Sequence, residues 1–389
     1  MLTYLLKANR WLFILYGTFY IAFTAFAQDK GLIDSLTGIK INETAFMRAL
    51  GANFGGWVEI GFTGNPQNPA NDSNAPVAFN DGANQFKLHQ VYGFIENKAD
   101  TGGKNWDIGF RADLLYGNDA HFTSTINFDT NVLDDQLVFP QGYADIYAPI
   151  GNGITVNIGH FYTIIGYESV PSTNNFFLSH AYTMLYGEPF TRTGILFSYP
   201  LNENFTAIGS IATGWDTFLR QPINYSGKIF YATNDKKTSA SVAFVTGDVK
   251  TNNLDNDHNR TLYSIVMEHD ITSRLHYVLQ HDLGFEEKII TGHSAHWYGV
   301  NQYLFYQFSN HLSAGLRAEW FSDQDGVRVI GNRKKENFID IALGLNYQLT
   351  PGLTMRPEIR YDHATENKVF NDNKSDDQIL LSLSAILSF

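Results

Sequence analysis

Apolar and polar residues alternate with a period of two along much of the chain. In residues 353–362, LTMRPEIRYD, every second position from Leu353 to Tyr361 is uncharged and mostly apolar, whereas Arg356, Glu358, Arg360 and Asp362 occupy the positions between them. A period of two indicates a β-strand with two chemically different faces. Pro357 cannot donate a hydrogen bond to a neighbouring strand, so we expect a local irregularity there.

About sixteen segments show this pattern, with boundaries uncertain by a few residues. They are residues 56–62, 84–96, 105–116, 141–148, 153–163, 191–199, 205–215, 227–233, 238–247, 261–268, 274–283, 297–307, 312–321, 337–347, 353–362 and 377–389. Short connections follow the even-numbered segments, and long polar connections follow the odd-numbered ones. This predicts an up-and-down meander with one end of tight turns and one end of long loops.

A closed transmembrane antiparallel β-barrel explains both the alternation and the unequal ends. The apolar face would meet lipid and the charged face a water-filled lumen, and closure would pair every backbone group inside the membrane. Strands of roughly 9–11 residues suffice to cross it. A soluble secreted β-sandwich or propeller would need shorter, more regularly spaced strands and an internal repeat, which the sequence lacks.

The chain divides into three parts. Residues 1–27 resemble a secretory signal peptide, because Lys7 and Arg10 precede an apolar run that ends in AFA at Ala27; a retained membrane anchor is the alternative. Residues 28–55 form an N-terminal segment, periplasmic or plugging the lumen, in which NETAFMRALG predicts a short helix with Asn42 as its cap and Gly51 as its end. Residues 56–389 form the barrel.

Composition narrows the possible functions. There is no cysteine, which excludes disulfides and thiolate metal sites. The net charge of −12 argues against nucleic-acid binding. Aromatic residues make up 15% of the chain, yet the mean hydropathy is only −0.20, so the apolar residues are dispersed, not massed in blocks.

Five stretches of the sequence resemble the β-barrel porins of the OmpL-like kind. They are GHFYTIIGYESVPSTNNFFLSHAYTMLYGEPFTRTGILFSYPLNENFTAIGSIATGW at 159–215, GFRADLLYGNDAHF at 109–122, QGYADIYAPIGNGI at 141–154, WYGVNQYLFYQFSNHLSAGLRAEWFSDQDG at 297–326 and RPEIRYD at 356–362. The resemblance implies an outer-membrane channel of a Gram-negative bacterium. It implies no particular functional residue, so the lumen must be analysed from its chemistry.

Charged side chains on the predicted inward faces are candidates for lining the pore. A basic residue on the lipid face would cost about 2–4 kcal/mol near the midplane, which explains why charges occupy one face only. They could line an aqueous path or simply pair with each other. The candidates are Lys87, Arg111, Asp113, Asp145, Arg317, Glu319, Arg356, Glu358, Arg360 and Asp362.

The third long loop, residues 164–190, is too apolar to lie in water. We expect it to fold into the lumen and to narrow the pore, as long ordered loops are usually functional. Glu168, His180 and Glu188 would then face a wall carrying Arg111, Arg317, Arg356 and Arg360. Opposed charges at a constriction set pore selectivity, and the excess of acids predicts a weak preference for cations.

The sequence gives less support to an enzyme or to a metal site than to a channel. The chain lacks the G-x-S-x-G and H-E-x-x-H motifs, which argues against an outer-membrane phospholipase or protease. Histidines crowd between His269 and His296, where a metal site is conceivable, although His276 is expected in the lumen and His293 and His296 in a loop. Asp255 and Asp257 could hold calcium, but their spacing favours a solvated loop. No cofactor is expected.

The sequence therefore predicts a porin for passive diffusion of small hydrophilic solutes and ions. The alternative is a substrate-specific or plugged barrel with a role in transport, adhesion or scaffolding. Expected partners are outer-membrane lipid, the solutes, and the barrel-assembly machinery, which would engage the C-terminal strand that ends at Phe389. A homotrimer is a plausible assembly, and no nucleic acid is expected.

Overall fold

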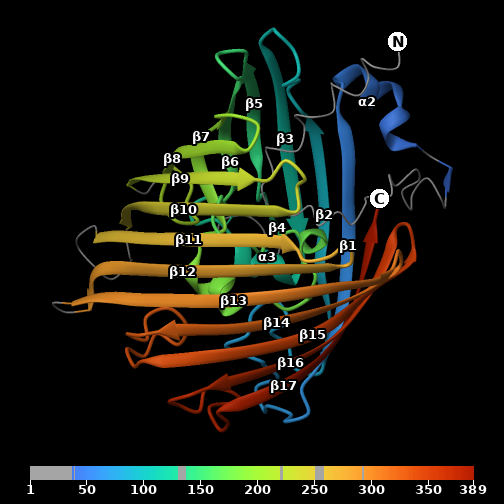
Figure 1. Ribbon diagram of the computed structural model, residues 1–389. Helices are drawn as coiled ribbons and strands as arrows, with labels where there is room; N and C mark the ends of the chain where they lie inside the picture. The colour runs from blue at the N-terminus through green and yellow to red at the C-terminus, as the bar shows by residue number, and fades with distance from the viewer. Residues whose placement is uncertain (1–36, 39, 130–136, 220–221, 250–257, 291–292) are drawn as a thin grey trace.

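The computed structural model describes residues 37–38, 40–129, 137–219, 222–249, 258–290 and 293–389, with the backbone alone at 288–290 (Figure 1). The predicted signal peptide and the candidate calcium ligands Asp255 and Asp257 lie outside these residues.

A single closed antiparallel sheet forms the molecule. Each strand pairs with the next along the chain, and β1 pairs with both β2 and β17, which closes the ring. The short β4 and the longer β5 pair with different parts of β3, so together they occupy one of sixteen positions. The strands are β1 (Asn53–Gly64), β2 (Gln85–Asn97), β3 (Asp107–Tyr116), β4 (Leu137–Val138), β5 (Gly142–Ala148), β6 (Ile154–Tyr162), β7 (Thr191–Pro200), β8 (Phe205–Thr213), β9 (Ile223–Ala232), β10 (Thr238–Val249), β11 (His258–Asp270), β12 (Leu275–Ile290), β13 (His293–Ser309), β14 (Leu312–Asp323), β15 (Glu336–Thr350), β16 (Leu353–Ala364) and β17 (Asp377–Ser388). The predicted all-β barrel is confirmed.

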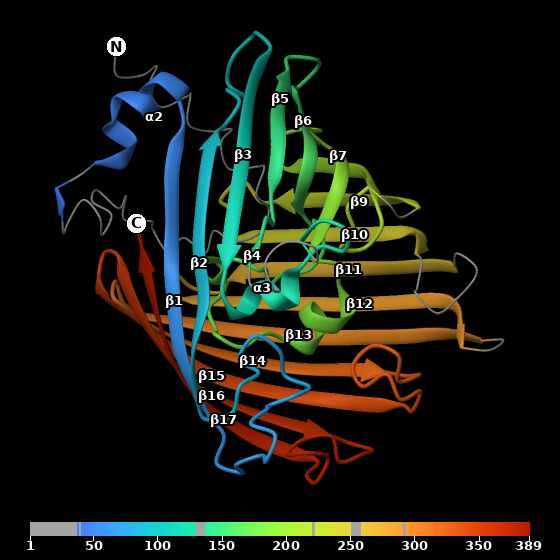
Figure 2. The same ribbon diagram turned by 180° about the vertical axis from the view of Figure 1, so that it is seen from behind.

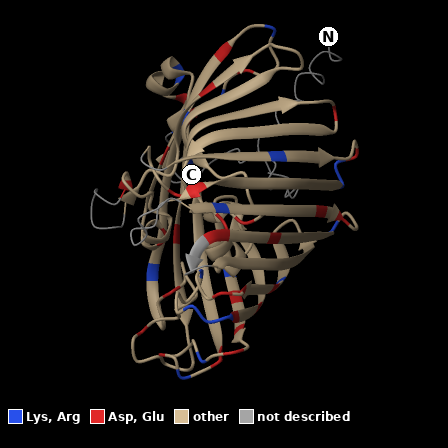
Figure 3. Ribbon diagram, turned by 90° about the vertical axis from the view of Figure 1, so that its left-hand side faces the viewer, with Lys and Arg blue, Asp and Glu red and all other residues tan. Residues whose placement is uncertain are grey.

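The two faces of the strands differ as the alternation predicts. On β14, the outward Leu316 is 40% exposed and the inward Arg317 is 0% exposed. In the side view of Figure 3 most of the strand surface is uncharged, and many charged residues lie in the connections. Exposed aromatic side chains near the strand ends are suited to the lipid headgroup regions; they include Phe86, Trp106, Tyr116, Tyr225, Phe308, Trp320 and Tyr347.

The two ends of the barrel also differ. One end, called here the short-turn end, carries the connections 98–106, 149–153, 201–204, 233–237, 271–274, 310–311 and 351–352. The other, called the long-loop end, carries the long connections 65–84, 163–190, 324–335 and 365–376, and that between β3 and β5, which contains α3 (Asn118–Thr123).

One predicted loop at the long-loop end is wrong. Only residues 291–292 separate β12 from β13, so the expected loop at 284–296 is strand at 284–290 and 293–296, and His293 and His296 belong to β13. The reason is that the inward Glu286 is held there by Arg260 and His258, which continues the ladder beyond the apolar part of the strands.

The expected irregularity at Pro357 is present. The ladder between β15 and β16 runs through Gly344–Glu358 and resumes at Tyr347–Met355 in the same register, so the positions opposite Pro357 and Arg356 are missing from it. On its other side Pro357 pairs in register with Leu383 of β17. The proline therefore interrupts one ladder without displacing the strand.

A short helical segment precedes β1. It consists of the 3₁₀ turn η2 (Ile41–Glu43) and α2 (Ala45–Leu50), and Figures 1 and 2 show α2 beside the first residues of β1. Gly51 ends α2 as predicted, with φ of 60°, but the cap is Thr44, which accepts a hydrogen bond from the backbone N–H of Met47. Asn42 instead accepts a hydrogen bond from the backbone N–H of Phe54 at 2.7 Å and donates one to its carbonyl at 3.0 Å. These two bonds connect the helical segment to β1. Among the described residues no helix is long and apolar enough to cross a membrane.

Candidate functional site

The connection between β6 and β7, residues 163–190, is here called the inner segment. It contains η4 (Ser172–Asn174) and the π-helical turn η5 (Thr183–Gly187), and most of its side chains are buried. Its residues hydrogen-bond to inward-facing side chains of β2, β12, β13, β14 and β16. Phe176 and Phe177 pack on Phe305 of β13, and Tyr182 stacks on Phe338 of β15.

Wall arginines supply donors to the backbone of the inner segment. Arg317 donates to the carbonyl of Ser179 at 2.7 Å, and Arg360 to that of His180 at 2.6 Å. Arg356 donates to the carbonyl of Asn175 at 3.0 Å. A buried segment with little regular structure must find partners for its carbonyl groups elsewhere, and these guanidinium groups provide them.

Wall carboxylates do the same for the N–H groups. Glu358 accepts from the backbone of Leu178 at 2.8 Å and of Ser179 at 3.2 Å. Glu319 accepts from Tyr182 at 2.6 Å and from Thr183 at 2.7 Å. The charged side chains of β14 and β16 therefore hold the inner segment through hydrogen bonds to its backbone N–H and carbonyl groups.

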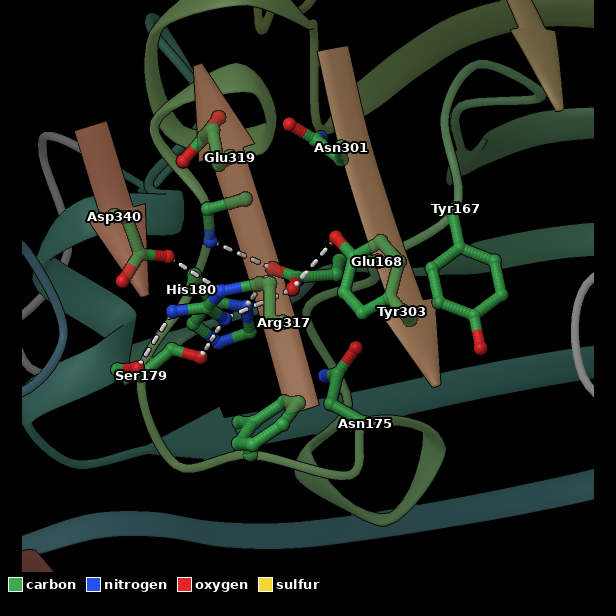
Figure 4. A network of polar contacts seen from close by, with 12 residues as sticks. Tyr167, Glu168, Asn175, Ser179, His180, Asn301, Tyr303, Arg317, Glu319 and Asp340 are labelled. Carbon is green, nitrogen blue, oxygen red and sulfur yellow. Dashed lines mark hydrogen bonds and ion pairs between the residues drawn. The ribbon is translucent and has the colours of Figure 1, made fainter. Parts of the chain in front are cut away.

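Glu168 is the centre of this network (Figure 4). One carboxylate oxygen accepts from Arg317 and from the Tyr303 hydroxyl, each at 3.0 Å. The other accepts from the backbone of Ala181 at 2.9 Å and lies 3.2 Å from Nδ1 of His180. Arg317 also donates to Asp340 at 2.6 Å, so one guanidinium joins two carboxylates. Glu168 and His180 are both buried and bound to each other.

Glu188 lies elsewhere in the barrel. Its carboxylate accepts from Nε2 of Gln280 on β12 at 2.6 Å, and Gln280 also donates to Asp282. Of the three residues predicted for the constriction, Glu168 and His180 thus lie together and Glu188 lies beside another part of the wall, and none of them is exposed.

The remaining predicted pore-lining residues lie on four strands, β2, β3, β5 and β16. Arg111 pairs with Glu96 and with Asp113, at 2.8 Å in each case. Lys87 lies at the long-loop end, bound to Asp81 and Asn118.

At the short-turn end, Asp145 accepts from the backbone of Ala99 at 3.1 Å. On β16, Arg360 pairs with Asp362, and Arg356 pairs with Glu59 of β1. Glu59 was not predicted, although the alternation in GWVEIGF places it inward.

The wall formed by β7 to β10 was not predicted as part of the site. Its inward residues include Arg192 and Lys228, while most others are small or hydroxylated, such as Ser210 and Ser226. The alternation in NYSGKIF could have identified Lys228, since Tyr225 and Ile229 mark the outward face.

The crowded histidines do not meet. His276 pairs with Asp270 at 2.7 Å, whereas His296 lies beside Asp325. In the part of the chain that the structure describes, no group of three or more histidine, cysteine or acidic residues is placed to hold a metal ion.

Solved outer-membrane channels share this fold. The anion-selective porin from Comamonas acidovorans has a TM-score of 0.57 at 10% identity, covering 87% of this chain and 99% of its own. The channel DcaP of Acinetobacter baumannii has a TM-score of 0.56 at 13% identity, covering 87% and 97%. The in-vitro folded, trimeric form of OmpT of Vibrio cholerae has a TM-score of 0.56 at 9% identity, covering 87% and 99%.

At such low identities the likeness concerns the fold alone, and no curated protein matches the chain. A family match does extend over nearly the whole barrel, including the inner segment and both closing strands. Over residues 51–389 the chain belongs to the family described as "Putative beta-barrel porin-2, OmpL-like".

Proposed function

We propose that this protein is an outer-membrane channel through which small hydrophilic solutes and ions diffuse passively. The observation that carries the proposal is the division of the barrel interior: the inner segment hydrogen-bonds to one side of the wall, whereas β7 to β10 present a different surface of mostly small side chains. A barrel of this size leaves an aqueous path unless it is filled. The family membership supports the same function.

The inner segment narrows the lumen. The expected weak cation preference rested on the excess of acids at a constriction where Glu168 and Glu188 would face a basic wall. Glu168 instead pairs directly with Arg317, and the basic wall donates to the segment's own carbonyls. We therefore assign Glu168, His180 and the charges of β14 and β16 to holding the constriction in place.

A planar-bilayer recording tests the proposal. The purified full-length barrel should insert as discrete current steps that are linear in voltage, and a detergent blank should give none. Current that a particular solute blocks would indicate a substrate-specific channel. Complete silence of a correctly folded barrel would indicate a plugged barrel with an adhesion or scaffold role, and would reject passive diffusion.

The proposed topology follows from the ends of the barrel. The short-turn end and α2 would lie in the periplasm, the long-loop end outside the cell, and residues 1–27 would direct export as a signal peptide. The C-terminal strand, β17, would be the part recognised during barrel assembly. A homotrimer is consistent with the trimeric form of OmpT, a protein of the same fold. The family and fold favour a channel over an enzyme.

A further inference from the structure

The inner segment covers one side of the barrel interior. Its hydrogen bonds to side chains reach Gln90 on β2, Gln280 on β12, Asn301 on β13, Glu319 on β14 and Glu358 on β16. These strands are contiguous around the closed ring, because β17 and β1 lie between β16 and β2. The hydrogen-bonded sector thus runs from β12 through the closure to β2, while Ile165 of the inner segment belongs to the same apolar cluster as Ala243 and Val245 of β10.

The opposite sector is built from β7 to β10. Residues directly opposite each other in an antiparallel sheet share a face, so the register defines its inward surface as four successive rows. From the short-turn side these are Pro200–Thr206–Phe230–Ser241, Ser198–Ile208–Lys228–Ala243, Leu196–Ser210–Ser226–Val245 and Gly194–Ala212–Asn224–Gly247. Small and hydroxylated side chains predominate, and the Ser210 and Ser226 hydroxyls lie 2.5 Å apart.

Lys228 is the only charged residue in these rows. The row that contains it continues through Ser264 to Asp282, which is inward and fully buried, so Lys228 faces the interior as well. Among the described residues no carboxylate forms an ion pair with its ammonium group; Glu268 and Glu188 act on it only through their charge. This contrasts with Arg317, Arg356 and Arg360, each of which pairs with a carboxylate.

Arg192 is a second inward base of this wall, and it lies nearer the long-loop end than Lys228 does. It lies one inward position beyond Gly194 on β7, and its Nε and Nη2 atoms are buried without a partner in the described part of the chain. At roughly 3.3 Å per residue along a strand, Arg192 and the row of Lys228 are separated by about 20 Å. The inward positions of the strands β7 to β10 thus carry these two bases and no acid, while Asp216 in the connection between β8 and β9 acts on Arg192 through its charge.

We infer that Lys228 is a selectivity-determining residue of the channel, and that ions pass along the β7–β10 wall with a preference for anions. This inference depends on the proposed channel function. Lys228 is only 5% exposed, so little open space lies directly in front of its side chain. An ion that passes there must approach the ammonium group closely, where a fixed charge acts strongly because little water separates the two.

Reversal potentials across a KCl gradient test the inference. The wild-type channel should favour chloride, although the whole chain has a net charge of −12. Lys228→Glu should lower the ratio of anion to cation permeability by roughly threefold or more, because a ring charge at a narrow point sets selectivity. Lys228→Gln should have an intermediate effect, and Arg192→Gln should add to it.

The matched control is Lys237→Glu, an identical charge reversal in the exposed turn 233–237 at the short-turn end. It should leave the reversal potential unchanged. Each variant is first checked for the same heat-induced gel shift as the wild-type barrel, so that misfolding is not mistaken for an effect on selectivity.

The outcomes separate the two proposals. A folded wild-type barrel without current refutes the channel function itself. A conducting wild type that favours cations, or a Lys228→Glu variant with an unchanged reversal potential or the same shift as Lys237→Glu, leaves the channel function intact and overturns the role of Lys228.

Discussion

At the scale of single residues, the inward charges of this barrel have two different environments. Arg317 is fully buried and donates to Asp340, Glu168 and the Ser179 carbonyl. Lys228 takes part in no ion pair within the described residues. A buried charge that has lost its partners is costly, whereas a charge beside a narrow aqueous path can be changed without breaking other contacts.

Arg317→Leu should therefore destabilise the protein. Removing the guanidinium leaves Asp340 and Glu168 buried without their main partner, at a cost of about 3–5 kcal/mol. The midpoint of denaturant unfolding in detergent should fall accordingly. Arg274→Leu, in the exposed turn 271–274, is the matched control and should change little.

Substituting the two acids that lose Arg317, Glu168 and Asp340, is a second test. Adding Glu168→Gln and Asp340→Asn to Arg317→Leu should recover part of the lost stability, because uncharged amides cost less to bury unpaired than carboxylates do. If Arg317→Leu unfolds at the same midpoint as Arg274→Leu, the network around Glu168 does not stabilise the barrel.

At the scale of elements, the inner segment is held by hydrogen bonds between its backbone and the side chains of β14 and β16. Glu358 accepts from the N–H groups of Leu178 and Ser179, near the middle of the segment. Few helical or strand hydrogen bonds are available within the segment, so its position depends on these wall groups.

Glu358→Ala should loosen the inner segment without opening the barrel. The backbone of Leu178 and Ser179 would lose its acceptor, and the wall of paired strands would remain. Single-channel recordings should show larger and noisier open currents than the wild type. Glu203→Ala, which removes an exposed carboxylate in the turn 201–204, should give wild-type traces. Quiet traces of unchanged amplitude for Glu358→Ala would show that the segment does not restrict the current.

At the scale of the whole molecule, the closed ring and its unequal ends determine the orientation in the membrane. Connections rich in exposed charge occur at both ends, for example Arg333, Lys334 and Lys335 in 324–335 and Lys236 and Lys237 in 233–237. The proposed topology puts the first group outside the cell and the second in the periplasm.

Trypsin added to intact cells should thus cut after Arg333, Lys334 or Lys335 and spare Lys236 and Lys237. Exposed loop tips are the preferred sites of proteolysis. Permeabilising the outer membrane should make the turn 233–237 accessible, and mass spectrometry of the fragments distinguishes the two sites. Cleavage in the turn 233–237 alone on intact cells would reverse the orientation.

The strands and the direction of their side chains could be predicted from the sequence, because each strand carries its own alternation and the lipid tolerates few charges on the outward face. The alternation in LTMRPEIRYD predicted that Arg356, Glu358, Arg360 and Asp362 point inward and that the ladder is irregular at Pro357. Both features are present. It misjudged 284–296, where polar residues continue the ladder above the lipid and resemble a loop.

Contacts between distant parts of the chain decide which inward charges are bound and which have no ion-pair partner among the described residues. Arg317 and Lys228 have the same local pattern, an inward base between outward apolar residues. They differ because, among the described residues, the inner segment hydrogen-bonds to charged side chains of β14 but not to Lys228 of β9. That arrangement depends on closure of the ring and on contacts between residues far apart in the chain, such as Glu168 with Arg317 and Leu178 with Glu358, which alternation within a strand does not encode.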